Sequence, residues 1–249
     1  MTNPIDSFEK VFSNKNKILI VFSHPDDAEL YSGGTIARLV ASGREVRVVK
    51  MTMGEKGSKQ ENVSEEELKK IRLKEDKEAM KILGIKDENN IYLDLGDGQI
   101  TNDLNIIEML VRQVREFNPD IVITHNPENI IIRFAKDVNW FNHRDHLYTG
   151  RNVIDATYPY ARDILFFPEH LSDSKYRSHT VTEFLFVDSY GHEDEVFIDV
   201  TDYLETRIKA HACHSSQYSI QAARDSADFF TSQEGTDRRY ERFRYVVAD

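Results

Sequence analysis

The sequence predicts an α/β protein with a Rossmann-like, largely parallel sheet, helices on both faces and a small C-terminal extension. Short β-branched runs alternate with segments of helical periodicity, which is the pattern of repeated strand–helix–strand units. The first run, Lys17–Phe22, is apolar almost throughout, as expected for a central strand buried on both faces. A chain of 249 residues suits one domain, so residues 1–249 are expected to form a single domain.

The elements follow in regular order along the chain. Expected strands are Lys17–Phe22, Arg44–Met51, Ile91–Leu95, Ile121–Thr124, Glu183–Val187 and Glu195–Val200. Expected helices are Thr35–Ala41, Ser64–Gly84, Asn105–Phe117, a segment from about His143 to Ala161, and one from Thr201 toward Gln217. Residues after Tyr218 show no clear pattern.

The helix after Ser64 has the best defined ends. Ser64 and Glu67 form a capping-box pattern, and Gly84 suits the left-handed residue that ends a helix. Its apolar stripe is expected to comprise Leu68, Ile71, Ala79 and Leu83.

Composition argues against several classes of partner. The chain has 32 basic and 43 acidic residues, a net charge of −11, whereas nucleic-acid binding needs a concentrated basic face. Its apolar runs are too short to cross a bilayer, and the N-terminal stretch lacks the apolar core of a secretory signal. Cys213 is the single cysteine, which suits a reducing compartment. We therefore expect a cytoplasmic protein with a small-molecule partner, no nucleic acid and no membrane insertion; self-association stays open.

Polar residues follow the expected strands at the point where each one ends. His24-Pro25-Asp26-Asp27 comes after the first strand, Asp97 after the third and His125 after the fourth. In open α/β sheets ligands bind outside the carboxyl ends of the strands. These side chains are therefore expected to share one site.

The spacing of two pairs of residues, one at the first strand end and one farther along the chain, indicates a metal ion. His24 and Asp27 are three residues apart on a turn, and His143 and His146 are one helical turn apart. A short pair with a remote third ligand leaves one position open, as in catalytic zinc sites. Each pair alone is also compatible with an ordinary turn or a solvated helix start, and Asp145 with a favourable first-turn carboxylate.

A nucleotide-binding fold is the first alternative, because Gly33-Gly34 precedes a helix. Phosphate cradling needs a glycine-rich turn directly after the strand. Here Asp26, Asp27 and Glu29 occupy that turn and would repel a pyrophosphate.

The segment from His24 to Leu39, HPDDAELYSGGTIARL, resembles the signature of the LmbE/PIG-L family of zinc-dependent N-deacetylases. Further similar segments are TMGEKG (Thr52–Gly57), RLKEDKEAMKILG (Arg72–Gly84), PDIVITHNP (Pro119–Pro127), HRDH (His143–His146), DATYPYARDILFFPEHL (Asp155–Leu171) and IDVTDYLETRIKAHACHSSQ (Ile198–Gln217). The resemblance covers most of the chain and implies a Rossmann-like fold.

The resemblance also implies roles for individual residues. It implies that His24, Asp27 and His146 hold one Zn²⁺, with Fe²⁺ or Co²⁺ as alternatives. Asp26 would be the general base, and His143 would stabilise or protonate the intermediate. The substrate implied is an N-acetylated amino sugar or its conjugate, hydrolysed by a metal-activated water.

Three further residues are assigned to the same site. Asp145 is a candidate to orient a neighbouring imidazole. Arg72 and Asp97 are candidates for binding sugar hydroxyls, by resemblance and by their placement, although a surface charge is the alternative for Arg72. His125 and His214 are expected to be structural histidines.

The sequence departs from the family pattern in two places. Arg144 stands where the family usually has proline. Residues 128–142, with Phe134, Trp140 and Phe141, form a longer link than usual, and we expect a lid that narrows the substrate range. Two alternatives to the deacetylase remain: a catalytically inactive metal-binding interaction protein of this fold, and a zinc amidohydrolase for a non-sugar N-acyl substrate.

Overall fold

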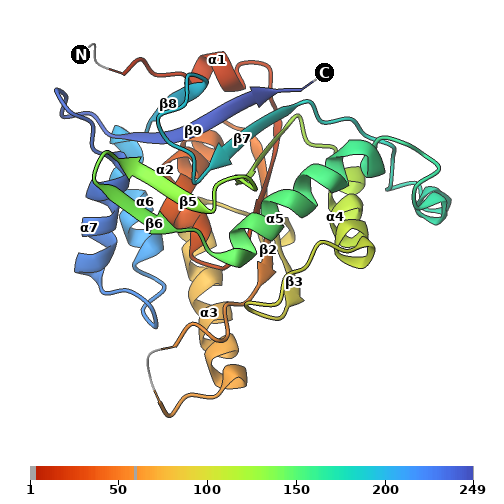
Figure 1. Cartoon of the computed structure of the whole chain (residues 1–249), viewed down its shortest axis with the longest axis horizontal. Coiled ribbons are helices and arrows are strands. Elements are labelled where there is room, and N and C mark those ends of the chain that lie inside the picture. Colours follow the sequence, from red (N-terminus) through yellow and green to blue (C-terminus); the bar gives the residue numbers. More distant parts are fainter. Residues whose placement is uncertain (1–3, 59–60, 249) are drawn as a thin grey trace.

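The computed structural model describes residues 4–58 and 61–248 and contains a seven-stranded sheet in the order β3-β2-β1-β4-β7-β9-β8 (Figure 1). Its strands are β1 (Lys17–Phe22), β2 (Glu45–Thr52), β3 (Asn90–Leu95), β4 (Ile121–His125), β7 (Glu183–Val187), β8 (Glu195–Asp199) and β9 (Tyr240–Val247). A separate hairpin consists of β5 (Ile131–Ala135) and β6 (Val138–Phe141).

The helices are α1 (Phe8–Phe12), α2 (Asp27–Ala41), α3 (Glu65–Leu83), α4 (Leu104–Phe117), α5 (Arg144–Asp155), α6 (Leu204–His211) and α7 (Ile220–Thr231). Four shorter helical turns are η1 (Asp87–Asn89), η2 (Ala156–Ala161), η3 (Pro168–Ser172) and η4 (Thr201–Tyr203). No helix within residues 4–58 and 61–248 is both long and apolar enough to cross a membrane.

The sheet is largely parallel, as predicted. Strands β3, β2, β1, β4 and β7 are parallel neighbours, so their carboxyl ends lie at one edge. Strand β9 pairs antiparallel with both β7 and β8. The expected C-terminal extension therefore includes a strand inside the main sheet, which the irregular pattern after Tyr218 did not reveal.

Both faces of the sheet are covered, and alternate residues of β1 show how. Ile18, Ile20 and Phe22 pack in one core with residues of α1, α2, α3 and α6. Leu19 and Val21 pack in a second core with residues of α4 and α5. Successive side chains of a strand point to opposite faces, so β1 is buried on both sides and its carboxyl end lies at the centre of the sheet edge.

Helix α3 confirms its predicted ends and corrects its predicted stripe. Ser64 and Glu67 form the capping box, and Gly84 has the left-handed φ of 81°. Leu68, Ala79 and Leu83 are buried, but the prediction for Ile71 is wrong because it is 43% exposed. Arg72, Glu75 and Asp76 are buried instead. Buried polar side chains therefore occupy positions of α3 at which helical periodicity predicts apolar ones. The hydrogen-bond partners of Arg72 are described below.

The glycine pair Gly33-Gly34 in α2 allows close packing. A Cβ on Gly34 would lie 2.6 Å from Val200 Cβ, and one on Gly33 would lie 2.9 Å from Arg207 Cγ. The helix departs from helical geometry at Ser32. The Glu241 carboxylate of β9 then accepts hydrogen bonds from the Gly34 and Thr35 amides, at 2.8 and 2.7 Å.

Candidate metal centre

The turn between β1 and α2 carries the first group of site residues. Asp26 is the N-cap residue of α2 and Asp27 its first helical residue. The His24 amide donates to Asp27 Oδ2 at 2.8 Å, which folds the turn back on itself. The His24 and Asp27 side chains are therefore brought together locally, at the carboxyl end of the central strand.

Helix α5 brings the remote histidines to the same place. His143 is its N-cap residue, and its Nδ1 accepts the Asp145 amide at 3.1 Å. A Cβ on Gly150 would lie 2.2 Å from the His125 carbonyl oxygen. Only glycine lets α5 approach the end of β4 so closely, and this approach places His146 beside the β1 turn.

The three expected ligands lie together. Asp27 Oδ2 is 3.4 Å from His24 Nδ1, and Asp27 Oδ1 is 3.4 Å from His146 Nε2. Ring nitrogens of His24, His143 and His146 also lie within 4.8 Å of one another. Asp27, His125 and His146 form a second such group, and His24, Asp97 and Asp145 a third. The described residues thus include a His/Asp cluster able to hold a metal ion, and imidazole and carboxylate donors without thiolate suit a catalytic zinc site.

Charge pairing controls protonation in this cluster. Burial opposes charge on His24, but hydrogen bonds to Asp145, Asp27 and Asp97 raise its pKa well above the ordinary value. Burial likewise opposes charge on His146, yet the Asp27 carboxylate raises its pKa to about 9. The pKa of Asp27 is held well below its usual range, against the effect of burial, chiefly by His146. A divalent cation can replace the protons that these imidazoles hold.

Asp26 lies beside the cluster and pairs with a different cation. Arg72 Nη2 donates to Asp26 Oδ1 at 2.8 Å, and Arg72 Nη1 donates to the Gly54 carbonyl at 2.8 Å. Burial raises the pKa of Asp26, but the charges of Arg72, His214 and His24 together more than offset this effect and lower the pKa, with Arg72 the strongest of the three. Arg72 is 3% exposed, so the alternative interpretation of Arg72 as a surface charge is wrong. Its role in binding a sugar stays a prediction.

Asp97 and Asp145 face the other side of His24. Asp97 Oδ1 and Asp145 Oδ2 lie 3.3 and 3.6 Å from His24 Nε2. Asp145 Oδ2 also accepts the Gly98 amide at 2.7 Å, and Asp97 Oδ2 accepts the Lys56 amide at 3.0 Å. These carboxylates are placed to orient the His24 ring so that Nδ1 faces Asp27.

Sequence reasoning missed Asp188; it placed His125 at the same edge of the sheet but favoured a structural role for it. Asp188 follows β7 directly, and its Oδ2 lies 2.7 Å from His125 Nδ1. His125 Nε2 lies 3.3 Å from Asp27 Oδ2. The rule that polar residues at strand ends form the site would have found Asp188, had it been applied to the fifth parallel strand. His214 is buried beside Glu29, with His214 Nε2 3.4 Å from Glu29 Oε1.

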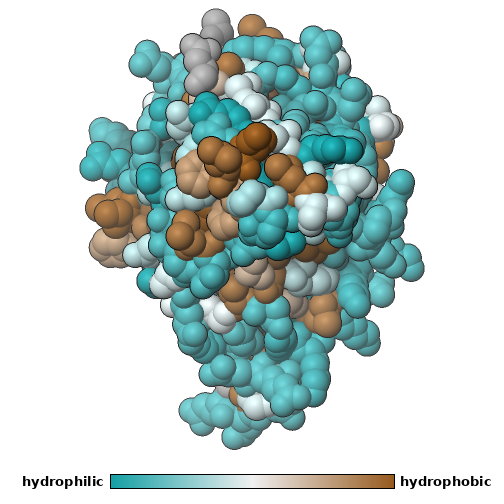
Figure 2. Space-filling model, turned by 90° about the vertical axis from the view of Figure 1, so that its right-hand side faces the viewer, coloured by the Kyte–Doolittle hydropathy of each residue, from teal (hydrophilic) through white to brown (hydrophobic). Residues whose placement is uncertain are grey.

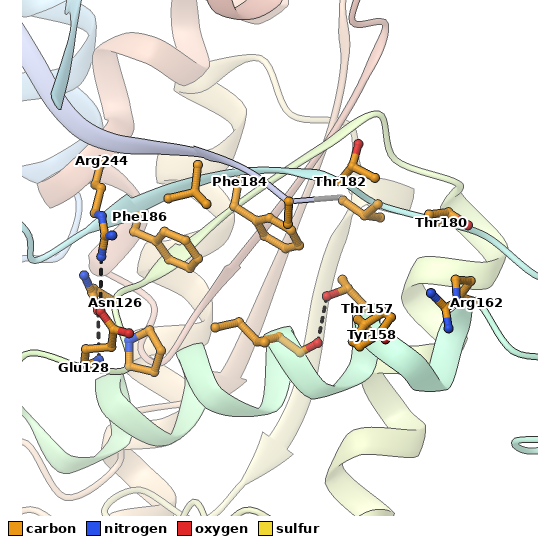
Figure 3. A pocket seen from close by; sticks show the side chains of 15 residues that line it. Asn126, Glu128, Thr157, Tyr158, Arg162, Thr180, Thr182, Phe184, Phe186 and Arg244 are labelled. Atoms are coloured by element: carbon orange, nitrogen blue, oxygen red, sulfur yellow. Dashed lines mark hydrogen bonds and ion pairs between the residues drawn. The ribbon is translucent and has the colours of Figure 1, made fainter. Parts of the chain in front are cut away.

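A cavity beside α5 is separate from this cluster. It has a volume of about 470 Å³ and lies between α5 and the strands β7 and β9, with Phe184 and Phe186 on one wall (Figure 3). Its lining residues include none of the expected site residues. The segment after α5 carries exposed apolar side chains, including those of Ile164 and Leu165. This segment lies on the right of Figure 1, the side that is turned toward the viewer in Figure 2.

Comparison with known proteins gives consistent matches. The PIG-L family, described as GlcNAc-PI de-N-acetylase, matches residues 19–157. A diacetylchitobiose deacetylase of Thermococcus kodakarensis is 30% identical over 207 residues, which are 83% of this chain and 72% of that protein. A probable N-acetyl-α-D-glucosaminyl L-malate deacetylase of Bacillus anthracis is 27% identical over 84% of both chains.

A solved structure extends the similarity to the fold. The N,N′-diacetylchitobiose deacetylase of Pyrococcus horikoshii, in complex with an inhibitor, superimposes with a TM-score of 0.81 at 27% identity. The match covers 96% of this chain and 87% of that one. Together with the His/Asp cluster at the carboxyl edge of the sheet, these matches show that the chain belongs to the PIG-L family of de-N-acetylases.

Proposed function

We propose that the chain is an N-deacetylase that hydrolyses the acetamide of an N-acetylated amino sugar conjugate. We further propose that His24, Asp27 and His146 hold one divalent ion, with Zn²⁺ as the first choice and Fe²⁺ or Co²⁺ as alternatives. The observation that carries this proposal is the Asp26 carboxylate, which lies next to the cluster but is paired with Arg72. Family membership supports a hydrolase of amide bonds.

Zinc bound by this donor set would supply Lewis acidity, polarising the acetamide carbonyl and making water more acidic. Asp26 supplies the base. Arg72 keeps its carboxylate ionised at neutral pH, so Asp26 can accept a proton from the attacking water. General-base help of this kind is typically worth about 10²–10⁴-fold.

His143 is proposed to stabilise the oxyanion. Its Nδ1 accepts the Asp145 amide proton, so a neutral ring carries its proton on Nε2. Burial and the neighbouring His24 and His146 charges lower the pKa of His143, which favours this neutral donor over a protonated imidazole. Loss of one such donor commonly costs about 10²–10³-fold.

The reaction then needs a proton on the nitrogen as the C–N bond breaks to give acetate and a free amine. Asp26 carries the proton taken from water and can return it. His143 could deliver this proton only from its protonated form, because a neutral ring that gave up its Nε2 proton would become an imidazolate, so Asp26 is the proposed proton donor.

The substrate class rests on the relatives. Their names specify diacetylchitobiose and N-acetylglucosaminyl malate as substrates, so we propose a small N-acetylated amino sugar conjugate for this chain. Nucleic acid and membrane insertion are not part of this proposal, and a cytoplasmic location stays a prediction from composition. Self-association stays open.

The segment of residues 128–142 folds as the β5–β6 hairpin. Phe134 and Trp140 stack at 5.7 Å between ring centroids, and Phe134 stacks on Phe229 of α7 at 4.3 Å. The hairpin is thus packed on α7 by aromatic contacts. Its role as a lid stays a prediction; replacing Trp140 with alanine should broaden the substrate range, and unchanged preference would contradict the lid.

An acetate-release assay tests the proposed function. The purified protein, with its metal content measured, is given N,N′-diacetylchitobiose, an N-acetylglucosaminyl malate and an N-acetyl amino acid, with and without a chelator. We expect chelator-sensitive release from a sugar substrate. Release from the amino acid alone would favour a non-sugar amidohydrolase, and no release despite bound metal would favour an inactive interaction protein.

A further inference from the structure

Two buried residues outside the expected site connect Asp27 to His146. Asp188 Oδ2 lies 2.7 Å from His125 Nδ1 and 3.4 Å from His146 Nδ1. His125 Nε2 lies 3.3 Å from Asp27 Oδ2, and Asp27 Oδ1 lies 3.4 Å from His146 Nε2. The four side chains therefore form a closed ring. His125 is the last residue of β4, and Asp188 directly follows β7.

The ring directs one nitrogen of His146, Nε2, toward the carboxylate of Asp27, the other expected ligand. His146 Nδ1 faces two acceptors, Asn142 Oδ1 at 3.1 Å and Asp188 Oδ2 at 3.4 Å. A neutral imidazole has one donor and one acceptor nitrogen, and the partner of the donor selects the tautomer. With its proton on Nδ1, His146 presents a lone pair on Nε2 toward Asp27.

His125 also restricts the plane of the His146 ring. The two rings are stacked, with centroids 3.8 Å apart and planes 13° apart. Both His125 and Asp188 are 0% exposed. Because neither side chain can exchange its partners for water, each holds its neighbour in one orientation.

The backbone at Asp188 is adapted to this placement. Asp188 has a φ of 59°, a left-handed conformation that costs free energy for most residues but that aspartate tolerates. Its carbonyl accepts a hydrogen bond from Asn129 Nδ2 at 3.0 Å. Strained backbone of this kind persists where the surroundings hold it in place, and such sites are often functional.

We propose that Asp188 and His125 are positioning residues, which orient His146 and Asp27 as ligands and so set the affinity for the metal ion. The inference rests on the proposed function, since it assumes that Asp27 and His146 ligate the ion. Hydrogen-bonding partners behind metal ligands typically contribute about 10- to 100-fold to metal affinity or activity.

Metal affinity is the measurement that tests this inference. Zinc dissociation constants are obtained by competition with a chromophoric chelator for the wild type, Asp188→Asn and His125→Gln. Each variant should bind zinc about 10- to 100-fold more weakly. The visible absorption of the cobalt-substituted protein should also change in each variant, because the ligand orientation around the ion is altered.

A matched control separates positioning from general packing. Asp199→Asn neutralises another buried carboxylate, whose Oδ1 accepts hydrogen bonds from the Thr201 amide and hydroxyl at 3.0 and 2.7 Å. Asp199 lies at the end of β8 and belongs to none of the metal-competent groups found among the described residues. Circular dichroism of the metal-free proteins confirms folding, and Asp199→Asn should keep wild-type zinc affinity and cobalt absorption.

The possible outcomes separate the positioning role of Asp188 and His125 from the proposed metal-dependent function. If the wild type binds no divalent metal, the metal-dependent function and this inference are both overturned. If the wild type binds zinc, and folded Asp188→Asn and His125→Gln bind it equally well with unchanged cobalt absorption, only the positioning role is overturned. A loss of affinity shared by Asp199→Asn would equally overturn it.

Discussion

The Arg72 guanidinium donates from Nη2 to Asp26 Oδ1 at 2.8 Å, and both side chains are buried. The general base of the proposed reaction is therefore paired with a cationic side chain of α3, a helix that its many Lys and Glu residues alone would place at the protein surface. An opposite charge at this distance typically lowers a carboxyl pKa by about 1–3 units. The pairing keeps Asp26 ionised without using it as a metal ligand.

Removing this cation should shift the pH dependence of the reaction. In Arg72→Met the pKa of Asp26 rises, because burial is then opposed only by the weaker charges of His214 and His24. The acid limb of the kcat/KM profile should therefore move to higher pH. If Arg72 acts only by binding sugar hydroxyls, KM rises instead and the acid limb stays in place.

Gly54 offers an independent way to displace Arg72. Its φ is 62°, and a Cβ there would lie 2.1 Å from Arg72 Nη1. Gly54→Ala should therefore lower kcat/KM and shift its pH profile in the same direction as Arg72→Met. Gly43→Ala is the matched control, because Gly43 has a φ of 83° with nothing within 4 Å of its Cβ position. Equal effects of both substitutions would point to backbone strain alone.

Asp26→Asn should keep the metal and lose turnover. The amide has nearly the same shape but cannot accept the proton of water, so kcat should fall by about 10²–10⁴-fold. Zinc content by mass spectrometry and acetate release are measured on the same preparation. Asp94→Asn, whose carboxylate pairs with Lys69 at the surface, is the control. Wild-type turnover in Asp26→Asn would remove the base assignment.

Metal affinity should rise with pH. In the metal-free protein the pKa of His146 is about 9 and that of His24 is raised, so both hold protons at neutral pH that a metal ion must displace. The apparent affinity should increase from about pH 6 and level off above about pH 9. Chelator competition across this range measures it. A flat profile would show that these imidazoles do not ligate the ion, and His146→Ala should abolish high affinity.

Glu241 should matter for stability. Its carboxylate lies 3.2 Å from Arg207 Nε and accepts the Gly34 and Thr35 amides. Glu241→Ala leaves Arg207 buried without its partner, and breaking such a pair typically costs about 3–5 kcal/mol. Urea denaturation should show this loss in the free energy of unfolding. The exposed Glu193→Ala should unfold at the wild-type midpoint; the same midpoint for Glu241→Ala would refute this account.

Local patterns were enough to predict most elements of the sheet and its helices. Strand β1 is a continuous apolar run, and α3 has a capping box and a terminal glycine, so short-range chemistry alone determines them. Ile71 shows the limit of this reasoning. Helical periodicity places it inside, but Arg72 is buried because Asp26 and Gly54 offer it partners, and those partners are 46 and 18 residues away in the chain.

By itself the sequence determined which chemical groups stand at the ends of the strands, because motif and strand pattern are both local. Only the tertiary structure decided how these groups pair. Arg72 pairs with Asp26, and Asp188 joins His125 to His146, through contacts between segments far apart in the chain. Such pairings depend on which strands are neighbours and how closely α5 approaches β4, and no local pattern records either distance.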